Sequence, residues 1–362
     1  MSFFNIHKKI AKAHTLPGDF YKNPAHFEAS KEQIFAATWQ YVADASVVQE
    51  KGEVYPFTLL PDVLNEPLLL VRGKDETTRC LSNVCTHRGK IIVEKSSKKP
   101  LLSCGYHGRC FRLDGSFKSM PEFEKTENFP NKVDDLAQIP LREWLGLQFV
   151  SLQPKVDFEE MIRPIQKRIG WMPLDTLVFQ EEGTQDFPLK ANWALYCDNY
   201  LEGFHVPFVH PALNNALDFK NYDYEIFPYC NLQIGIAEEG EPCFDLPENS
   251  PDFGRKVYAY YFWLFPNIML NFYPWGLSLN IIKPQNHQET VVSFRTYRFK
   301  DAAFNRTVNN LEQTEFEDEA VVESVQLGIQ SRYYKSGRFS PTMEKAVHHF
   351  HGLVAEFMGE TR

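Results

Sequence analysis

The sequence is poor in cysteine and has no excess of positive charge. Its seven cysteines are an odd number spread over 362 residues. That is a poor disulfide framework, so we expect a reducing, cytoplasmic location. Lysine and arginine total 38 against 47 aspartates and glutamates, for a net charge of −9. This balance excludes a basic nucleic-acid-binding module, and the chain offers no polybasic segment for a membrane surface.

Long apolar segments are also scarce. The N-terminus has no continuous apolar run, so we expect no secretory signal. Residues 257–282 carry no charge and are long enough to span a bilayer, but asparagines and prolines interrupt them. We therefore expect two buried strands joined by a turn near Pro274 and Gly276, and no membrane association. The chain also lacks a Gly-x-Gly-x-x-Gly fingerprint, so we expect it to hold no NAD(P)H site.

The remaining pattern predicts an α+β protein of two to three domains. A helix is expected after Asn23, with Pro24 in its first turn, and short β-like runs fill residues 47–152. A second strand-rich block covers residues 222–299. Two helices close the chain, and the last begins at Ser340 and Pro341. Its apolar stripe comprises Met343, Val347, Phe350, Val354 and Phe357. We predict a β domain inserted into an α+β domain, with the N-terminal helix belonging to the latter.

Two short loops each contain one cysteine and one histidine. The first holds Cys85 and His87, and the second holds Cys104 and His107. Two thiolates and two imidazoles can hold a [2Fe–2S] cluster, with the cysteines on one iron and the histidines on the other. Flanking glycines allow the close turns that such a cluster requires. A structural zinc site is the alternative, but it would favour two cysteines in one short motif. We assign the other five cysteines to packing or to the surface.

A second group of metal-binding residues lies downstream. His205 and His210 are five residues apart, a spacing that does not share a face of a regular helix. We expect Pro207 to distort the segment so that both rings reach one metal. Two histidines and a carboxylate form the facial triad of non-haem iron(II) oxygenases. The denser group of His348, His349 and His351 interleaves with the last predicted helix, and we place it at the surface or the core edge.

The acidic segment between residues 312 and 323 offers candidates for the third metal ligand, a carboxylate. Asp318 shares a helical face with the apolar residues Val322, Val325 and Ile329. An unpaired charge on that inward face would be costly, and ligation of a metal would relieve the cost. We therefore select Asp318 as the third ligand. Its neighbours Glu317 and Glu319 are expected to face solvent.

These motifs together resemble the catalytic α-subunits of the Rieske non-haem iron oxygenases over nearly the whole chain. The resemblance implies a β-rich Rieske iron–sulfur domain at residues 45–154, inserted into a helix-grip-like catalytic domain with an antiparallel sheet. Residues 1–44 would be the N-terminal helical segment of that catalytic domain, and residues 155–362 its main part. One [2Fe–2S] cluster and one mononuclear Fe(II) are implied. The motifs that carry the resemblance are Cys85-x-His87, Cys104-x-x-His107, residues 192–210, Asp318 and Glu323-x-x-Gln326-x-Gly328.

The resemblance also implies how the chain works. It would be a terminal oxygenase component that takes electrons from an NAD(P)H-dependent reductase or a ferredoxin. It would then use O2 to hydroxylate or demethylate a small organic substrate. The family usually forms homotrimers, in which the cluster of one subunit faces the iron of its neighbour. Glu202, three positions before His205, would bridge the two centres. A Rieske electron carrier without oxygenase chemistry is the alternative of a different class.

The substrate is the least determined feature. Glu202 and the motifs at residues 265–271 and 333–341 look most like the branch that oxidises choline, betaine and carnitine. Aromatic side chains can bind a quaternary ammonium group through cation–π contacts. An aromatic compound would fit the same lining, and a core role for these aromatic residues is also open. The candidates are Tyr260, Tyr261, Trp263, Phe272, Tyr273 and Trp275.

Overall fold

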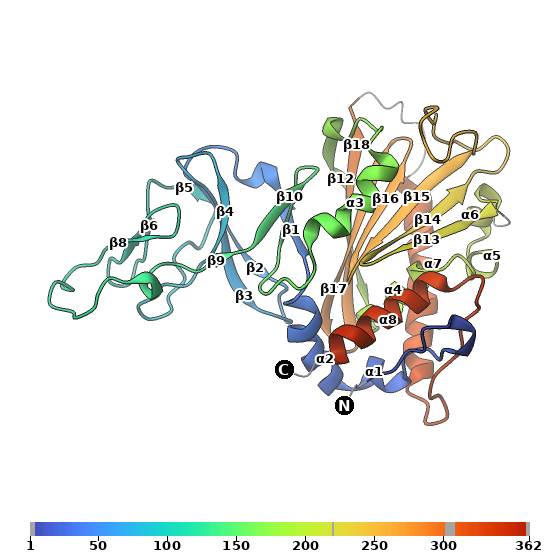
Figure 1. The fold of residues 1–362 in the computed structure, drawn as a ribbon, viewed down its shortest axis with the longest axis horizontal. Helices are drawn as coiled ribbons and strands as arrows, with labels where there is room; N and C mark the ends of the chain where they lie inside the picture. The colour runs from blue at the N-terminus through green and yellow to red at the C-terminus, as the bar shows by residue number, and fades with distance from the viewer. Residues whose placement is uncertain (1–3, 219–220, 301–307, 360–362) are drawn as a thin grey trace. The chain divides into compact units, whose positions relative to one another are not determined.

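The chain folds as two compact units. The computed structural model describes residues 4–218, 221–300 and 308–359. The larger unit comprises Met1–Phe35 and Val156–Arg362, and the β-rich unit comprises Ala36–Lys155 (Figure 1). The β-rich unit thus interrupts the sequence of an α+β unit. It begins at Ala36 and not at residue 45, because Gln40–Asp44 forms strand β1, which pairs with β11 (Leu147–Val150).

Three antiparallel sheets build the β-rich unit. The first has the order β5-β2-β3-β4-β9, with strands Ser97–Lys98, Glu53–Leu59, Glu66–Arg72, Thr78–Ser82 and Gln138–Ile139. The second has the order β1-β11-β10, where β10 is Leu141–Trp144. The third, β6-β7-β8, consists of Leu102–Ser103, Cys110–Phe111 and Phe117–Ser119. Single turns η3 (Ala45–Val47) and η4 (Lys132–Asp134) complete the unit.

Strand β3 is apolar at successive positions because it is covered on both faces. Leu68 and Leu70 belong to one core cluster, and Leu69 and Val71 belong to a second. The second cluster also contains both cysteines of the predicted iron–sulfur loops. The loops therefore rest directly on a packed apolar core, which gives them a rigid base.

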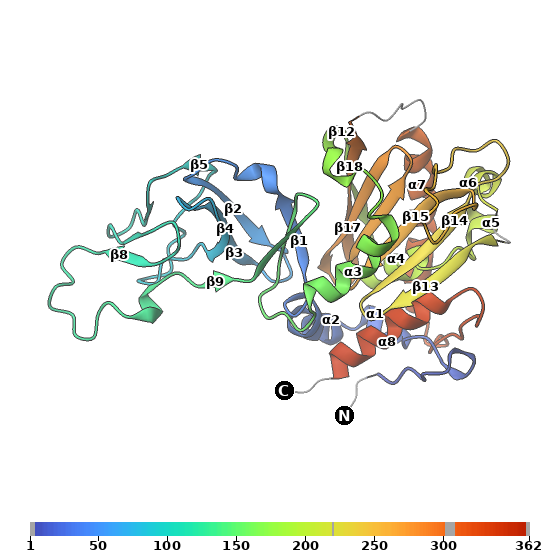
Figure 2. The same ribbon diagram turned by 45° about the horizontal axis from the view of Figure 1, so that its top comes forward.

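A seven-stranded antiparallel sheet forms the centre of the larger unit. Its order is β12-β18-β17-β16-β15-β14-β13. The strands in chain order are Leu177–Leu189, Asp223–Phe227, Cys230–Ile236, Val257–Leu264, Ile268–Tyr273, Gly276–Asn286 and Glu289–Phe299. Helices α4 (Trp193–Tyr200) and α7 (Val308–Ile329) lie on one face, and α3 (Phe158–Ile169) crosses the other (Figures 1 and 2).

The other helices of this unit are shorter or lie near the chain ends. They are η1 (Ile10–Lys12), α1 (Gly18–Lys22), α2 (Pro24–Ser30), η2 (Lys31–Phe35), η5 (Leu174–Thr176), α5 (Val206–Val209), α6 (Pro211–Ala216) and α8 (Lys345–Gly359). Pro24 opens α2, as predicted, and the Asn23 side chain accepts a hydrogen bond from the Ala25 backbone N–H. Helix α8 starts later than predicted, at Lys345. The Ser340 hydroxyl instead accepts from the Met343 N–H in a preceding turn.

The uncharged stretch from 257 to 282 forms three strands, not the two predicted. The predicted turn between β16 and β17 is present at Pro274. A further turn at Pro266 and Asn267 separates β15 from β16. The Asn267 amide donates to the Ile282 carbonyl oxygen at 2.7 Å, so this asparagine serves the sheet. Among the described residues, no helix is long and apolar enough to cross a membrane.

One face of this sheet carries a row of polar side chains, which are buried except for the half-buried Tyr261. Gln233, Tyr261, Asn271 and Ser278 are directly opposite one another on β14, β15, β16 and β17. Tyr258 is an extra residue in β15, where the pairing with β14 shifts between Gly235 and Ile236. A bulge of this kind redirects a side chain relative to simple alternation. These residues face the helices that carry the predicted iron ligands.

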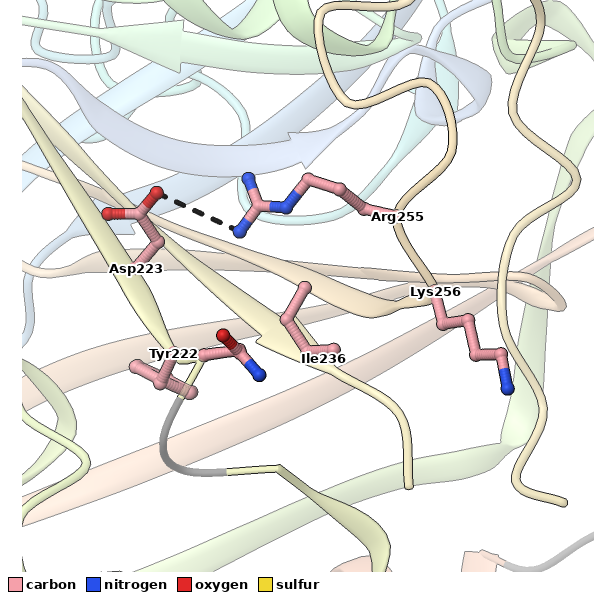
Figure 3. A pocket seen from close by; sticks show the side chains of 6 residues that line it. Tyr222, Asp223, Ile236, Arg255 and Lys256 are labelled. Carbon is pink, nitrogen blue, oxygen red and sulfur yellow. Dashed lines mark ion pairs between the residues drawn. The ribbon is translucent and has the colours of Figure 1, made fainter. Parts of the chain in front are cut away.

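The opposite face and the edge strand β13 are held by an ion-pair network. The Asp252 carboxylate is buried and accepts from Arg168 at 2.7 Å, from Arg255 at 2.9 Å and from the Tyr260 hydroxyl at 2.9 Å. Arg255 also approaches Asp223 of β13 at 3.7 Å across an open pocket of about 410 Å³ (Figure 3). Both acidic partners compensate the Arg255 charge, so we assign this network a structural role.

Gly276 is the first residue of β17 and follows a tight turn, and a substitution there tests how closely the backbone packs. Its φ is +153°, and an added Cβ would lie 2.1 Å from the Tyr297 carbonyl oxygen. We expect Gly276→Ala to lower the free energy of unfolding by about 3 kcal/mol or more, because both backbones would have to move. Gly352→Ala in α8 is the control, since nothing lies within 4 Å of its added Cβ. It should be neutral or stabilise by up to about 1 kcal/mol. Equal effects of the two variants in urea denaturation would contradict this account.

Candidate metal centres and substrate cavity

The two cysteine–histidine loops have the same backbone hydrogen bonds. In the first, the Cys85 N–H donates to the Lys90 carbonyl at 2.9 Å, and the Gly89 N–H returns to the Cys85 carbonyl at 3.0 Å. In the second, the Cys104 N–H donates to Arg109 at 2.8 Å, and Gly108 returns to Cys104 at 3.2 Å. Gly89 and Gly108 both have φ near +70°, at +72° and +71°. Because L-residues rarely adopt this conformation, glycine at each position is required by the turn.

The loops bring like side chains together. The thiols of Cys85 and Cys104 are buried beside each other, and the His87 and His107 ring centroids are 4.8 Å apart. Burial and the second thiol raise the pKa of Cys85, although backbone N–H groups act against this. Two adjacent thiols without a disulfide are stabilised as thiolates by a metal. A thiol pair and an imidazole pair from two matched loops fit a Rieske [2Fe–2S] cluster.

Asp134 joins the two loops. Its carboxylate accepts from the Arg109 guanidinium at 2.7 Å, and its carbonyl oxygen accepts from the Thr86 hydroxyl at 2.8 Å. Arg109 is almost fully buried and lies over the ring of Phe117 at 5.0 Å. Burial alone would raise the pKa of Asp134, but the Asn131 backbone N–H and the Arg109 guanidinium lower it below its usual range. This buried ion pair, which sequence reasoning did not identify, holds both loops in place.

Other cysteines and histidines have structural surroundings. Cys80, Cys197 and Cys230 are buried, Cys110 is half-buried and Cys243 is exposed. The His351 imidazole is buried and is 2.7 Å from the Asp198 carboxylate, while its other nitrogen accepts from the Leu16 N–H at 3.0 Å. His348 and His349 contact the carbonyl oxygens of His7 and Pro228. None of these residues lies in the metal-ligand group formed by described residues.

His205 and His210 flank the single turn α5. Pro207 lies in the first turn of α5, where a proline costs no hydrogen bond, so it does not kink a continuous helix as predicted. The break occurs at His210, whose φ and ψ are −118° and 81°, because the next residue is Pro211. A residue before proline is driven out of the helical region. This break brings the two rings to a centroid distance of 5.1 Å.

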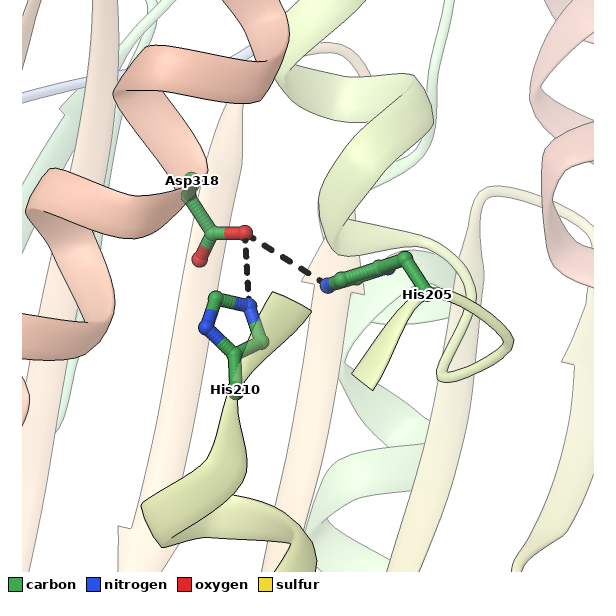
Figure 4. Close-up of side chains that lie close together, drawn as sticks. All are labelled: His205, His210 and Asp318. Atoms are coloured by element: carbon green, nitrogen blue, oxygen red, sulfur yellow. Dashed lines mark hydrogen bonds and ion pairs between the residues drawn. The ribbon is translucent and has the colours of Figure 1, made fainter. Parts of the chain in front are cut away.

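Asp318 of α7 completes the group (Figure 4). Its Oδ1 is 3.4 Å from His205 Nε2 and 3.0 Å from His210 Nε2. One ligand atom from each residue lies within 4.8 Å of the others. The Asp318 side chain is inward-facing with Val322 and Ile329, but Val325 is 43% exposed and Gln326 takes its place in the core. Two imidazoles and one carboxylate on one side of a cavity fit non-haem iron(II).

Each histidine of this group also contacts a carboxylate through its other nitrogen. Glu202 Oε1 is 2.6 Å from His205 Nδ1, and Glu317 Oε2 is 2.7 Å from His210 Nδ1. The expectation that Glu317 faces solvent was therefore wrong, because the extended His210 presents its Nδ1 to it. Burial would lower the pKa of His205, but Asp318 and Glu202 raise it to about 9. The group thus favours positive charge, as a cation site requires.

The motif Glu323-x-x-Gln326 fixes α7 against the segment that carries the histidines. The Glu323 carboxylate accepts from the Lys190 N–H at 2.9 Å, and the Gln326 side chain accepts from the Asn192 N–H at 2.9 Å. The Asn192 side chain in turn caps the start of α4. This motif therefore positions residues and does not bind the metal directly.

A cavity of about 180 Å³ adjoins His205, His210 and Asp318. Its floor is the polar row of the sheet, including Asn271 and Ser278, and Glu202 also lines it. Of the predicted aromatic candidates, Tyr261 and Tyr273 line the cavity, whereas Tyr260, Trp263, Phe272 and Trp275 do not. Sequence reasoning missed most of the lining tyrosines. The full set is Tyr196, Tyr200, Tyr222, Tyr258, Tyr261 and Tyr273.

Glu315 is a further cavity residue that the sequence did not single out. It lies on α7 one turn before Asp318 and is 3% exposed. Its Oε2 accepts from the Tyr196 hydroxyl at 2.6 Å. Burial raises the pKa of Glu315 well above its usual range, although the Tyr196 bond acts against this. Its i, i+3 spacing from Asp318 is the only sequence signal that could have placed it on the inward face.

Comparison with known proteins agrees with both centres. Residues 38–130 match the Rieske [2Fe-2S] domain, and residues 174–360 match the ring hydroxylating alpha subunit (catalytic domain). The chain is 30% identical to the chloroplastic choline monooxygenase of Beta vulgaris, over 94% of this chain and 76% of that protein. It is 29% identical to the carnitine monooxygenase oxygenase subunit of Escherichia coli K12, over 95% and 94%.

The fold of the chain is similar to that of a solved structure. That structure is a quaternary ammonium Rieske monooxygenase described in connection with carnitine oxidation by gut microbiota. The TM-score is 0.77 at 26% identity, and the match covers 95% of each chain. The fold, the sequence match over both domains and the two groups of candidate metal ligands lead to one conclusion. The chain belongs to the Rieske non-haem iron oxygenases, oxidoreductases that use O2, and it combines a Rieske domain with a ring-hydroxylating α-subunit catalytic domain.

Proposed function

We propose that this oxygenase oxidises a quaternary ammonium compound, as a monooxygenase. The observation that carries the proposal is the tyrosine-lined cavity beside His205, His210 and Asp318. Tyrosine rings attract ammonium cations through their electron-rich faces. No lysine or arginine is present among the described lining residues, so no permanently charged side chain there repels a cation. The choline and carnitine monooxygenases among the relatives act on the same class of compound by name.

We assign the metal ligands residue by residue. Cys85, Cys104, His87 and His107 would hold one [2Fe–2S] cluster, and His205, His210 and Asp318 would hold one iron(II). The iron centre would supply O2 activation at its open positions. The overall reaction places one oxygen atom into a C–H bond and reduces the other to water, with two external electrons and two protons. On an N-methyl carbon, the resulting hydroxymethyl group leaves as formaldehyde and the amine has lost a methyl group.

The carboxylates beside the histidines would orient these ligands. Glu202 and Glu317 each accept a hydrogen bond from an imidazole Nδ1, which leaves Nε2 free to face the metal position. Such outer carboxylates fix the tautomer and raise the basicity of a ligand histidine. Glu202 would also connect the iron ligand His205 to the electron donor.

The membership of the oxygenase family also suggests how the chain assembles and which protein supplies its electrons. We propose a homotrimer, in which the cluster of one subunit supplies the iron of the next through Glu202. The electrons would come from an NAD(P)H-dependent reductase or a ferredoxin. A cytoplasmic location is supported by the seven cysteines, none of which forms a disulfide. An electron carrier would have no use for the triad, so the triad argues against that alternative.

Metal analysis tests the ligand assignment. We expect about three irons per chain in the wild-type protein and about two in His205→Ala, which keeps the cluster but loses turnover. Cys104→Ser should instead lose the cluster absorbance and its electron paramagnetic resonance signal after reduction with dithionite. A His205→Ala protein that retains the third iron and full oxygenase activity would refute the mononuclear site.

Glu317→Gln tests the outer carboxylate of His210. Removing a hydrogen-bonded carboxylate from a ligand histidine weakens metal binding by about 10–100-fold. We expect that loss in a titration with Fe(II) or Co(II), while the cluster spectrum stays unchanged. Glu319→Gln removes the same charge from the same helix without touching a histidine, so its metal affinity should match the wild type. Equal affinity of Glu317→Gln and wild type would show that the contact does not support ligation.

Oxygen consumption with a surrogate reductase tests the substrate class. Choline, glycine betaine and L-carnitine should be compared with benzoate and other aromatic acids. We expect substrate-dependent O2 uptake, with product formed in proportion, for at least one quaternary amine and for none of the aromatic acids. Turnover restricted to an aromatic acid would favour the ring-hydroxylating alternative, and a rapidly reoxidised cluster without any product would favour an electron carrier.

A further inference from the structure

Glu315 is the one described carboxylate of the cavity that no histidine uses. The lining contains three described acidic residues, Glu202, Glu315 and Asp318. Glu202 contacts His205, and Asp318 lies between both histidines. The Oε2 atom of Glu315 accepts from Tyr196, but its Oε1 is buried and has no partner among the described residues. A buried polar atom without a partner is costly, and in a residue that lines a cavity it points to a ligand that is bound during function.

The chemistry of that ligand follows from the surroundings. The groups that act on Glu315 are the Tyr196 hydroxyl from α4 and the acids Asp318 and Glu319 on its own helix. None of these supplies positive charge. A neutral ligand would leave the Glu315 carboxyl group in the uncharged form that burial favours, and an anion would be repelled by Asp318. A cation, in contrast, would be attracted by Glu315 and by Asp318, the two acids of α7 that line the cavity.

The position of Glu315 also matches the reaction. It precedes Asp318 by three residues on α7, and side chains at this spacing are neighbours about 5–6 Å apart at Cβ. We propose that Glu315 is the counter-charge that binds the cationic nitrogen of the substrate and thereby presents an adjacent carbon to the metal ligands. This inference rests on the proposed function and adds to it the residue that selects for charge.

The tyrosines alone would not achieve that selection. Their rings accept both an ammonium cation and its neutral carbon isostere, and the cation–π gain for one ring is modest. A carboxylate favours only the cation, because the neutral isostere has no charge to pair with it. Glu315 therefore should determine charge preference, while the tyrosines determine shape.

Binding to the holoenzyme without its reductase separates these contributions, since no turnover occurs. Calorimetric titrations would use choline, tetramethylammonium and the neutral isostere 3,3-dimethylbutan-1-ol. We expect Glu315→Gln to weaken binding of the two cations by about tenfold or more, as for truncation of a buried charge pair. Affinity for the neutral alcohol should change by less than about twofold, which a merely structural defect would not produce. Glu315→Asp should recover part of the affinity for the cations.

Controls make each outcome informative. Glu319→Gln removes a charge one turn further along α7 from a residue outside the cavity lining, and it should bind both cations like the wild type. The iron content and the cluster spectrum of every variant should equal those of the wild type. If the wild type binds a cation and Glu315→Gln binds it equally well, the Glu315 inference is overturned while the proposed function stands. If the wild type binds neither cation, the ammonium substrate class itself fails, and this inference fails with it.

Discussion

The candidate iron centre depends on the attachment of one helix, α7, to the start of α4. Asp318 and the histidines are far apart in sequence, at a separation of 108 residues for His210. Nothing local can therefore set the distance between the carboxylate and the imidazoles. The side chains of Glu323 and Gln326 set it by accepting the backbone N–H groups of Lys190 and Asn192. Because these bonds are to the backbone, they fix the position of α7 along α4 and not only its proximity.

A second constraint is the balance of buried charge. Glu202, Glu317 and Asp318 surround two imidazoles, and Glu315 adds a fourth carboxyl group to the same region. Such an excess of acidic groups is unfavourable in a protein interior unless cations or protons accompany it. An iron(II) beside Asp318 and a cationic substrate beside Glu315 would each supply positive charge where a carboxylate is placed. The ligand assignment and the substrate class thus answer the same electrostatic requirement.

Sequence reasoning grouped residues that do lie together where the determining interactions are short in range. The cysteine–histidine loops are six-residue turns that contain their own hydrogen bonds, and Asp318 was selected by helical periodicity within one element. It failed where a distant segment decides. Glu317 was expected at the surface, and only the contact from His210 makes it part of the centre. Periodicity likewise predicted that Val325 faces inward. The inward residue is Gln326 instead, because its side chain accepts a hydrogen bond from the Asn192 backbone N–H.

The tyrosine-lined cavity beside His205 and Asp318 illustrates why aromatic residues could not be assigned from sequence alone. Residues 257–273 are rich in aromatics on both faces of the sheet, so composition cannot separate cavity from core. Register separates them: Tyr261 is opposite Gln233 and Asn271 in the polar row, whereas Tyr260 reaches Asp252 on the other face. The bulge adds Tyr258 to the cavity against simple alternation. Polar residues at every second position of an apolar strand, such as Ser278 and Asn280, are therefore a better sequence signal for this cavity than aromatic content. In an apolar core such residues would be buried without hydrogen-bond partners.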